Sequence, residues 1–490
     1  MGRKRNNRAW AGLVTLAVGL GGGLSCDRGS AWQSHTDAGD AAYQRGQYPQ
    51  AAQAYSAALK EAEGFGSNDP RLATSLNNMG NLYYAQAQYA DAEPLYRRAL
   101  AIRETVLGPD RPEVATSLNN LALLCNARGW HAEAEPLYQR ALNVSEKALG
   151  PEHPTLAGTL NNLAELYRLQ SRYAEAEPLY RRALAIREKA LGPGHADLVG
   201  PLNNLGEFYR VQGRYAEAEP LYQRSQALAE KAFGPEHPAV ATSLNNLGLL
   251  YRAQRKYAEA ESLYERSLAI REKALGPDHP DVAVSLSNLA LLYWSQGRYA
   301  DAEPLLKRAL AVREKALGPE HAASLITLNH LAQLYRTEGK FAEAEPLFAG
   351  LLARRENTLG PDHPDVAAAL NSLAELYNLA GRFAEAEPLF QQAVTICEKA
   401  FGPEHPTVAT GLNNLATLYH AQSRYAEAES LYRRSLEIIE KALGADHPEL
   451  VTNLENLGLM LKEMNRVEES EALLARAEAI RQRNAAPDRP

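Results

Sequence analysis

Apolar and polar positions along this chain repeat in blocks of 42 residues. Every step has the same length, and a fixed period of this size predicts stacked structural repeats, each packed on its neighbours. A degenerate copy around Tyr43 and Tyr48 precedes the regular ones, so we expect eleven units within residues 34–483. The blocks are aligned on the leucine that precedes Asn-Asn or a related pair, at Leu76, Leu118, Leu160, Leu202, Leu244, Leu286, Leu328, Leu370, Leu412 and Leu454.

Each block contains two amphipathic stretches with a helical period. Leu244, Leu247 and Tyr251 fall on one helical face, which predicts a first helix over about Pro238–Gln254. A second apolar stripe predicts another helix over Ala258–Leu275. The pattern therefore predicts an all-α solenoid of about eleven helix-turn-helix repeats.

Glycine and proline mark where these helices end and begin. Gly276 permits a positive φ at the end of a second helix, and Pro277 stops that helix. Pro280 then fits the first turn of the next helix, where its missing N–H is not needed. Pro201 is the exception, because it falls inside the first-helix pattern, and we expect that helix to begin late or to kink.

These paired helices resemble tetratricopeptide repeats. The 42-residue period, Leu-Asn-Asn-Leu-Ala and Leu-Gly-Pro-Glu-His-Pro resemble the kinesin light chain subtype in particular. The resemblance covers residues 34–483. It implies a right-handed superhelix whose concave groove, lined by the first helices, binds extended peptides. Kinesin light chains bind acidic peptides with a central tryptophan, and this family implies protein partners.

The N-terminus reads as an export signal. Arg3, Lys4, Arg5 and Arg8 precede an uncharged stretch that ends before Cys26. This segment resembles a bacterial lipoprotein signal, so we expect residues 1–25 to be removed, Cys26 to be lipidated and the protein to face the periplasm or the cell exterior from a membrane. Export as a soluble secreted or periplasmic protein, or an uncleaved anchor, stays open. We expect residues 26–33 to form a linker and residues 484–490 a tail.

Charge and composition exclude several classes of function. The formal net charge is −7, and loss of the signal would make it more negative, which argues against a nucleic-acid partner. Three cysteines are too few and too scattered for a disulfide framework. No catalytic grouping, metal site or cofactor site stands out, so we expect a protein that is not an enzyme.

Two columns of asparagine follow the first helices. A side-chain amide both donates and accepts hydrogen bonds, so these columns can pair with a peptide main chain of any sequence. The alternative is an internal ladder, in which each asparagine forms a hydrogen bond with the first helix of the next repeat. The candidate peptide-binding asparagines are Asn119, Asn161, Asn203 and Asn245 in the first column and Asn120, Asn162, Asn204 and Asn246 in the second.

A basic column follows one turn later, at Arg168, Arg210, Arg252 and Arg336. A guanidinium offers a planar fork to carboxylates, which suits an acidic peptide. The alternative is a solvated flank. Glu165 and Glu207 precede the first two arginines by three residues and can neutralise them, whereas Arg252 and Arg336 lack such a glutamate.

The recurring loop histidines and the cysteines of the repeats are interpreted as structural residues. One histidine recurs in each inter-repeat loop, and we interpret His153, His237 and their counterparts as turn residues, because helix axes about 8–10 Å apart cannot share an ion between single histidines. Cys125 replaces a core tyrosine, so we expect it to be buried. Cys397 stands in a column that is usually arginine, so we expect it to be exposed.

The sequence thus favours a monomeric, non-catalytic scaffold that binds extended peptide segments of a partner protein. The alternative is a structural spacer or self-assembling rod without a peptide ligand. The polar stretch Val467–Glu471 in the last unit resembles a cap and argues against end-to-end stacking.

Overall fold

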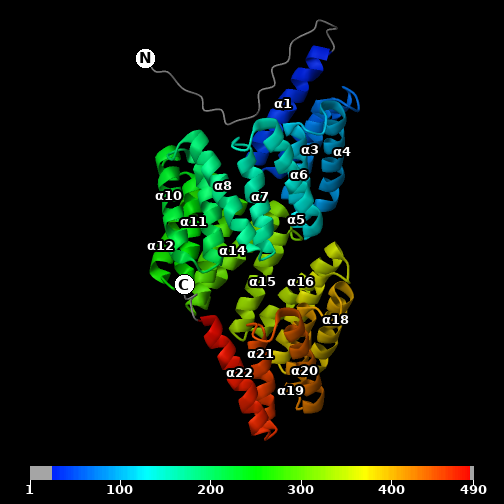
Figure 1. The fold of residues 1–490 in the computed structure, drawn as a ribbon, viewed down its shortest axis with the longest axis vertical. Coiled ribbons are helices and arrows are strands. Elements are labelled where there is room, and N and C mark those ends of the chain that lie inside the picture. Colours follow the sequence, from blue (N-terminus) through cyan, green and yellow to red (C-terminus); the bar gives the residue numbers. More distant parts are fainter. Residues whose placement is uncertain (1–24, 486–490) are drawn as a thin grey trace. The chain divides into compact units, whose positions relative to one another are not determined.

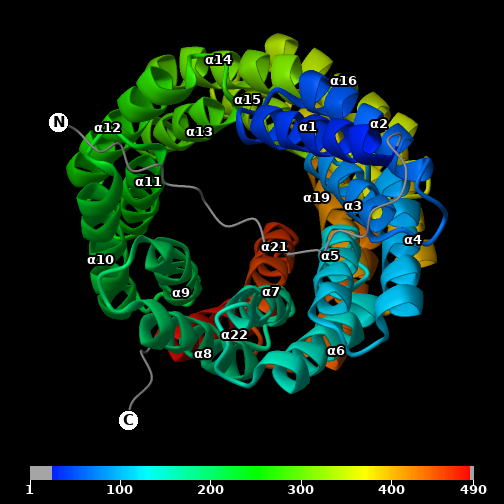
Figure 2. The ribbon, with the colours of Figure 1, turned by 90° about the horizontal axis from the view of Figure 1, so that it is seen from above.

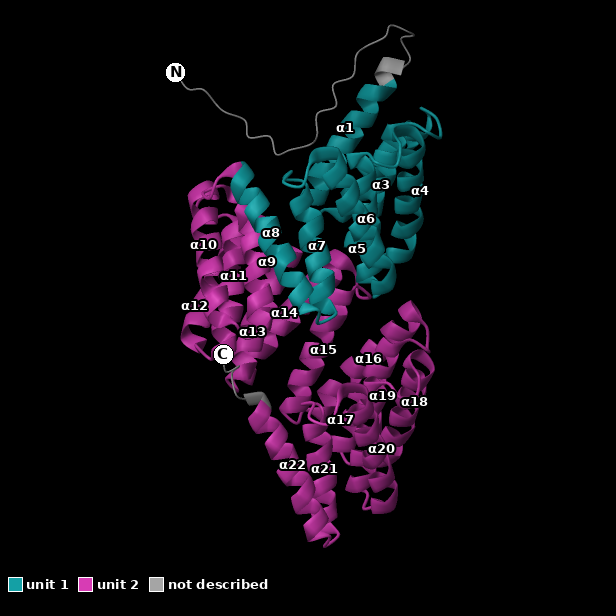
Figure 3. Ribbon diagram, viewed as in Figure 1, with its two compact units in different colours: residues 1–190 teal, residues 191–490 magenta. Residues whose placement is uncertain are grey.

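The computed structural model describes the backbone of residues 25–485 and the side chains of residues 28–483. The chain forms two compact units, residues 1–190 and 191–490 (Figure 3). The helices of the first unit are α1 (Ser25–Gln44), α2 (Tyr48–Glu63), α3 (Pro70–Ala85), α4 (Tyr89–Leu107), α5 (Pro112–Ala127), α6 (His131–Leu149), α7 (Leu156–Leu169) and α8 (Tyr173–Leu191), whose last residue belongs to the second unit.

The second unit continues the same alternation (Figure 1). Its helices are a short 3₁₀ helix η1 (Ala196–Leu198), α9 (Val199–Val211), α10 (Tyr215–Phe233), α11 (Pro238–Ala253), α12 (Tyr257–Leu275), α13 (Pro280–Ser295), α14 (Tyr299–Leu317), α15 (Ala322–Thr337), α16 (Phe341–Leu359), α17 (Pro364–Leu379), α18 (Phe383–Phe401), α19 (Pro406–Ala421), α20 (Tyr425–Leu443), α21 (Leu450–Glu463) and α22 (Val467–Ala485).

The predicted all-α solenoid is confirmed. Across residues 25–485 the structure contains 22 α-helices and no strand, arranged as successive helix pairs. Odd-numbered α-helices are the first helices of the repeats and even-numbered ones the second. The first helix of a repeat packs against its own second helix, as α5 does against α6 and α11 against α12. Several neighbouring first helices also contact each other, among them α3 and α5 in the first unit and α11 and α13 in the second. In the first unit α3 and α5 lie on the inner side of the curve that the helices follow, and α4 and α6 lie on its outer side (Figure 2).

Small residues in mid-helix let each pair pack closely. The ring of Tyr264 lies so near Gly248 that a Cβ atom there would be 2.7 Å from its Cε1. Of the residues predicted to form the apolar face of the first helix, Leu244 and Leu247 are buried and Tyr251 is half-buried. The glycine predicted to end α12, Gly276, has a φ of +88°, a conformation that side chains with a Cβ rarely adopt.

The loop histidines cap the first helices. In α11, α13, α15, α17 and α19 the Nδ1 atom of the histidine accepts a hydrogen bond from the backbone N–H two residues later, at 3.1 to 3.2 Å. Asp69 does the same for α3 at 2.8 Å. The prediction of turn residues is therefore confirmed, with a capping role that the spacing alone did not indicate.

Neighbouring repeats are also joined by a row of polar contacts, which we call the clamp. Each clamp consists of a second-helix glutamate, the tyrosine near the end of the next first helix, and a basic residue in the turn after it. The Tyr377 hydroxyl donates to Glu345 at 3.0 Å, and Arg382 donates to the same carboxylate at 2.6 Å. Glu303, Tyr335 and Lys340 repeat the arrangement, with a 2.9 Å Tyr335 bond.

The start of the chain departs from the prediction. Residues 26–33, expected to form a linker, belong to α1. The reason is Trp32, which packs beside the buried Leu72 and Leu76 and donates its indole N–H to Ser75 at 2.8 Å. The predicted signal, residues 1–25, lies outside the described residues except for Ser25, and so do the side chain of Cys26 and most of the predicted tail.

Two further sequence expectations have clear outcomes. Pro201 delays its helix as expected, because η1 occupies residues 196–198 and α9 begins at Val199. Cys125 is buried, as predicted, but the prediction that Cys397 is exposed was wrong, since its exposed fraction is 4%. Arg271 and Arg313 in the same column are themselves buried, so the column faces the interior and not solvent.

Candidate functional site

The predicted binding residues lie on one face of the first helices, which we call the first-helix face. On α11 this face carries Thr242, Asn246, Arg252 and Ala253, each exposed or half-buried, while Leu244 is buried on the opposite side. Equivalent positions on the neighbouring first helices continue the face within each unit. Within each unit, the structure therefore brings the second-column asparagines and the predicted arginines to a common surface, whereas the first-column asparagines lie mostly beneath it.

The two asparagine columns form part of an internal ladder. Asn120 donates to Asn77 at 2.8 Å and Asn162 donates to Asn119 at 3.0 Å in the first unit. In the second unit Asn288 donates to Asn245 at 2.8 Å. First-column residues are mostly buried, with Asn245 only 5% exposed. The amides that complete these bonds therefore hold neighbouring repeats together.

The ladder is interrupted at several first helices. The Oδ1 atoms of Asn161 and Asn203 are buried without a hydrogen-bond partner in the described structure. Asn204 is exposed and Asn246 is half-buried. Where the ladder is incomplete, an amide keeps donor or acceptor capacity that a peptide main chain can use.

Arg168 and Arg210 are neutralised within their own helices. Arg168 grips Glu165 through two bonds of 2.7 and 2.6 Å, and Arg210 grips Glu207 in the same way. The glutamate in turn accepts from the buried tyrosine of its repeat, as in the 3.1 Å bond from Tyr222 to Glu207. These repeats thus carry a closed triad of tyrosine, glutamate and arginine.

Arg252 has no such glutamate. Leu249 stands at the position that Glu207 occupies one repeat earlier. The Tyr264 hydroxyl is consequently buried without a hydrogen-bond partner, and burial raises its pKa. Among the described residues no acidic side chain lies within ion-pair distance of Arg252. The pKa of His330 is lowered, chiefly by burial and further by the positive charges of Arg313 and Arg252.

Arg336 pairs with a carboxylate that its own helix does not supply. It lacks a glutamate three residues earlier, as the sequence shows, but it forms an ion pair with Glu375 from the next first helix. Sequence reasoning missed this partner because it lies 39 residues away. Of the four predicted arginines, Arg252 is thus the one whose guanidinium the described structure leaves without a carboxylate.

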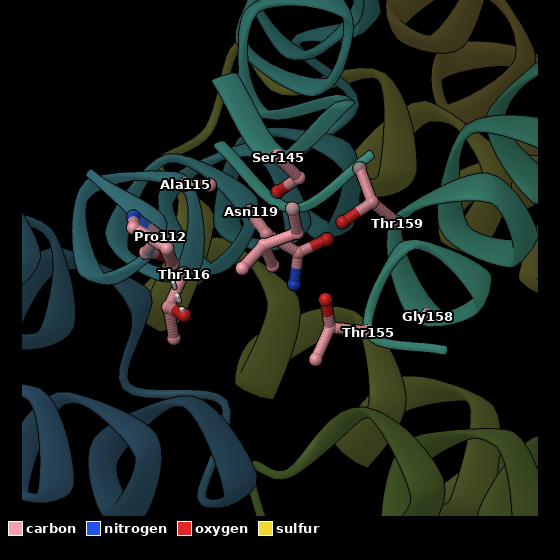
Figure 4. Close-up of a pocket in the computed structure, with 9 residues that line it drawn as sticks. Pro112, Ala115, Thr116, Asn119, Ser145, Thr155, Gly158 and Thr159 are labelled. Carbon is pink, nitrogen blue, oxygen red and sulfur yellow. Dashed lines mark hydrogen bonds between the residues drawn. The ribbon is translucent and has the colours of Figure 1, made fainter. Parts of the chain in front are cut away.

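A small pocket of about 180 Å³ opens beside Asn119 in the first unit (Figure 4). It lies between α5, the end of α6 and the start of α7. Thr116 and Thr155 are exposed at its mouth, while Ser145 and Thr159 are buried beneath them. The sequence analysis did not predict this pocket.

The described residues show no sign of two other kinds of site. No group of three histidine, cysteine, aspartate or glutamate side chains among them is placed to hold a metal ion. In the same part of the chain, no helix has the length and apolar character that crossing a membrane requires.

Comparison with protein families gives a clear result. A tetratricopeptide repeat model matches residues 33–105, 71–134, 113–189, 197–273, 244–315, 289–349, 324–399, 365–438 and 407–483. The chain belongs to the tetratricopeptide repeat family. Repeats of this family generally mediate protein–protein interaction and are typically not catalytic.

Solved structures similar to this tetratricopeptide repeat protein include two of a Podosopora anserina protein named as a kinesin light chain with nearly identical TPR-like repeats. They share 31% and 30% identity, cover 42% of this chain and 97% and 98% of their own, and have a TM-score of 0.39. BtubC (BKLC) from P. vanneervenii shares 26% identity over 48% of this chain and 91% of its own, with a TM-score of 0.37. A search of curated proteins returned no match.

Proposed function

We propose that this protein is a non-catalytic scaffold whose first-helix face binds an extended, acidic segment of a partner protein. Arg252 is the observation that carries the proposal. In two repeats a first-helix glutamate, Glu165 or Glu207, binds both a buried tyrosine and an arginine. In α11 Leu249 takes the place of this glutamate, so neither Arg252 nor the Tyr264 hydroxyl contacts a carboxylate. A carboxylate of the ligand completes the triad, and the unpaired amides of the ladder contact its main chain.

A comparison of two arginines tests this proposal. Partner proteins are recovered from native membranes with the wild-type chain, an Arg252→Ala variant and an Arg266→Ala variant as baits. Arg266 lies exposed on α12 and pairs with Glu230 at 2.8 Å, so its loss changes the net charge equally without touching the first-helix face.

We expect Arg252→Ala to weaken binding of the recovered acidic ligand by about 1–3 kcal/mol, because a hydrogen bond to a charged group is lost. The loss shrinks as salt rises, since exposed charges are screened over about 8–10 Å. Arg266→Ala should bind like the wild type. Equal binding by all three baits would remove the acidic-ligand proposal and favour a structural spacer.

We also propose that the protein is exported and anchored through a lipid on Cys26. The support is the sequence ahead of that cysteine, where basic residues at positions 3–8 are followed by an uncharged stretch over residues 9–24. Labelled palmitate should enter the wild type and not a Cys26→Ser variant. Label in both proteins, or in neither, would contradict the lipid anchor and leave export without lipidation.

A further inference from the structure

One column of second-helix positions carries an arginine in several repeats, and two of these arginines, Arg271 and Arg313, are buried. Arg271 on α12 is 5% exposed, and burial lowers its pKa. Its Nη1 donates to the Ser285 hydroxyl at 2.8 Å and to the Asp281 carbonyl at 3.1 Å, and its Nη2 donates to the Thr242 hydroxyl at 3.3 Å. The guanidinium thus lies in a cradle of neutral oxygens between two consecutive first helices.

The carbonyl and hydroxyl contacts of this cradle recur at other arginines of the column. In the first unit Arg103 donates to the Ser117 hydroxyl at 2.7 Å and to the Glu113 carbonyl at 3.2 Å. Arg313 donates to the Ala323 carbonyl at 3.2 Å and also to the Thr327 hydroxyl. Arg313 shows that threonine can replace serine as the acceptor. It also shows that the residue whose carbonyl accepts need not carry a carboxylate, since this residue is Ala323.

On α6 the arginine of this column is replaced by Ser145. Three 42-residue repeats separate Ser145 from Arg271, and the same shift converts the cradle residues Asp281, Ser285 and Thr242 into Thr155, Thr159 and Thr116. All four of these positions, Ser145 included, line the pocket beside Asn119 (Figure 4). The pocket therefore occupies the place where other repeats hold a guanidinium.

The polar groups of this pocket are deeply placed. Ser145 is 6% exposed and Thr159 is 8% exposed, whereas Thr116 and Thr155 remain accessible at the mouth. Gly158 adds room at the entrance, since a Cβ atom there would meet nothing within 4 Å. A volume of about 180 Å³ admits the end of one side chain and is below the range of about 300 Å³ and more that is typical of small-molecule sites.

We propose that this pocket receives the guanidinium of an arginine side chain from the partner protein, hydrogen-bonded by oxygens at the positions equivalent to those that hold Arg271. Thr159 Oγ1 and the Thr155 carbonyl accept from one nitrogen, and Thr116 Oγ1 accepts from another. A guanidinium suits this cradle because its planar fork donates in several fixed directions at once. The partner segment then carries an arginine in addition to acidic residues.

The inference rests on the proposed function for the identity of the partner as a protein. Its test uses small probes, so it can fail separately from the Arg252 experiment. The methyl resonances of Leu149 and Thr159 in the full chain are followed by NMR while N-acetyl-arginine amide is added. The neutral isostere N-acetyl-citrulline amide is the matched control, and free arginine is the third probe.

We expect a saturable shift at both methyl groups with the arginine amide, with a Kd on the order of 1 mM for so small a probe, and at least tenfold weaker binding of the citrulline amide. Ser145→Arg fills the pocket from within and should abolish the shift. Arg271→Ser opens the equivalent cradle and should create a second site beside Thr242. Circular dichroism verifies that both variants are folded.

Several results would overturn the inference. They are the absence of a saturable shift, equal binding of the citrulline amide, or an unchanged shift in folded Ser145→Arg protein. Binding of free arginine without binding of the blocked amide would assign the pocket to a free guanidino compound and contradict a protein ligand. If Ser145→Arg does not fold, Thr159→Val replaces it, and unchanged affinity in that variant contradicts the inference equally.

Discussion

At the scale of single residues, neighbouring asparagines have different tasks. Asn245 is buried and accepts from Asn288, whereas Asn246 is half-buried and makes no hydrogen bond that the described structure records. The sequence located both residues on the first helices but could not separate a ladder from a ligand site. The direction of a side-chain amide depends on the neighbouring repeat, which an isolated helix pattern does not contain.

Exchange of the two asparagines for alanine should therefore affect stability unequally. Asn245→Ala leaves the Asn288 amide without its acceptor and should lower the free energy of unfolding by about 1–3 kcal/mol. Asn246→Ala, the matched control, should change it by no more than about 0.5 kcal/mol. Urea denaturation measures both. A loss for Asn245→Ala no greater than that for Asn246→Ala would show that the bond from Asn288 to Asn245 does not stabilise the stack.

At the scale of the helices, sequence patterns predicted most boundaries because glycine and proline act locally. The pair predicted at Pro238–Gln254 and Ala258–Leu275 is found at Pro238–Ala253 and Tyr257–Leu275. The contacts that cross repeats were not predictable in the same way. Glu375 lies 39 residues from Arg336, and Trp32 lies 43 residues from Ser75, so their pairing depends on how the repeats stack.

The histidine caps predict a simple substitution series in α17. His363 Nδ1 accepts from the Asp365 N–H at 3.1 Å. His363→Ala removes the acceptor and should cost about 0.5–2 kcal/mol, while His363→Asn supplies a capping oxygen and should restore most of that loss. Asp69, which caps α3 through a side-chain oxygen, is the natural precedent. Equal stability of the alanine and asparagine variants would argue against capping.

Glu303, a clamp carboxylate that also pairs with Lys307 on its own helix, predicts a pH dependence in the acid range. Hydrogen bonds, chiefly from Lys307 and then from Tyr335 and Lys340, lower the pKa of Glu303 from its ordinary 4.5 to about 2. The folded protein therefore holds fewer protons than the unfolded chain in this window, and the contribution is complete above pH 4.5 and lost as the pH falls towards 2.

Glu303→Gln makes this contribution measurable. The variant should melt a few degrees below the wild type at pH 7, and the difference should disappear as the pH approaches 2. Glu320→Gln is the control, because Glu320 is exposed and makes no ion pair in the described structure. A difference for Glu303→Gln that stays constant over the whole range would contradict the ionised Glu303 carboxylate, bonded by Lys307, Tyr335 and Lys340, as the cause.

At the scale of the whole chain, repetition explains both what the sequence revealed and what it concealed. Near-identical repeats specify the tetratricopeptide fold many times over. The proposed function rests on the few positions where a repeat departs from the others, such as Leu249 before Arg252 and Ser145 in the arginine column of the second helices. Such departures can be interpreted only from the structure, because it shows which polar groups they leave without a hydrogen-bond partner.

Site-specific photo-crosslinking in the native cell tests most directly whether the first-helix face binds a partner protein. A photoreactive residue is placed at Ala253 on α11 or at Ala269 on α12, since both alanines are exposed and belong to the same repeat. The account predicts a crosslinked partner protein from position 253 and none from position 269. Crosslinks from position 269 alone, or from neither position, would contradict a ligand on the first-helix face.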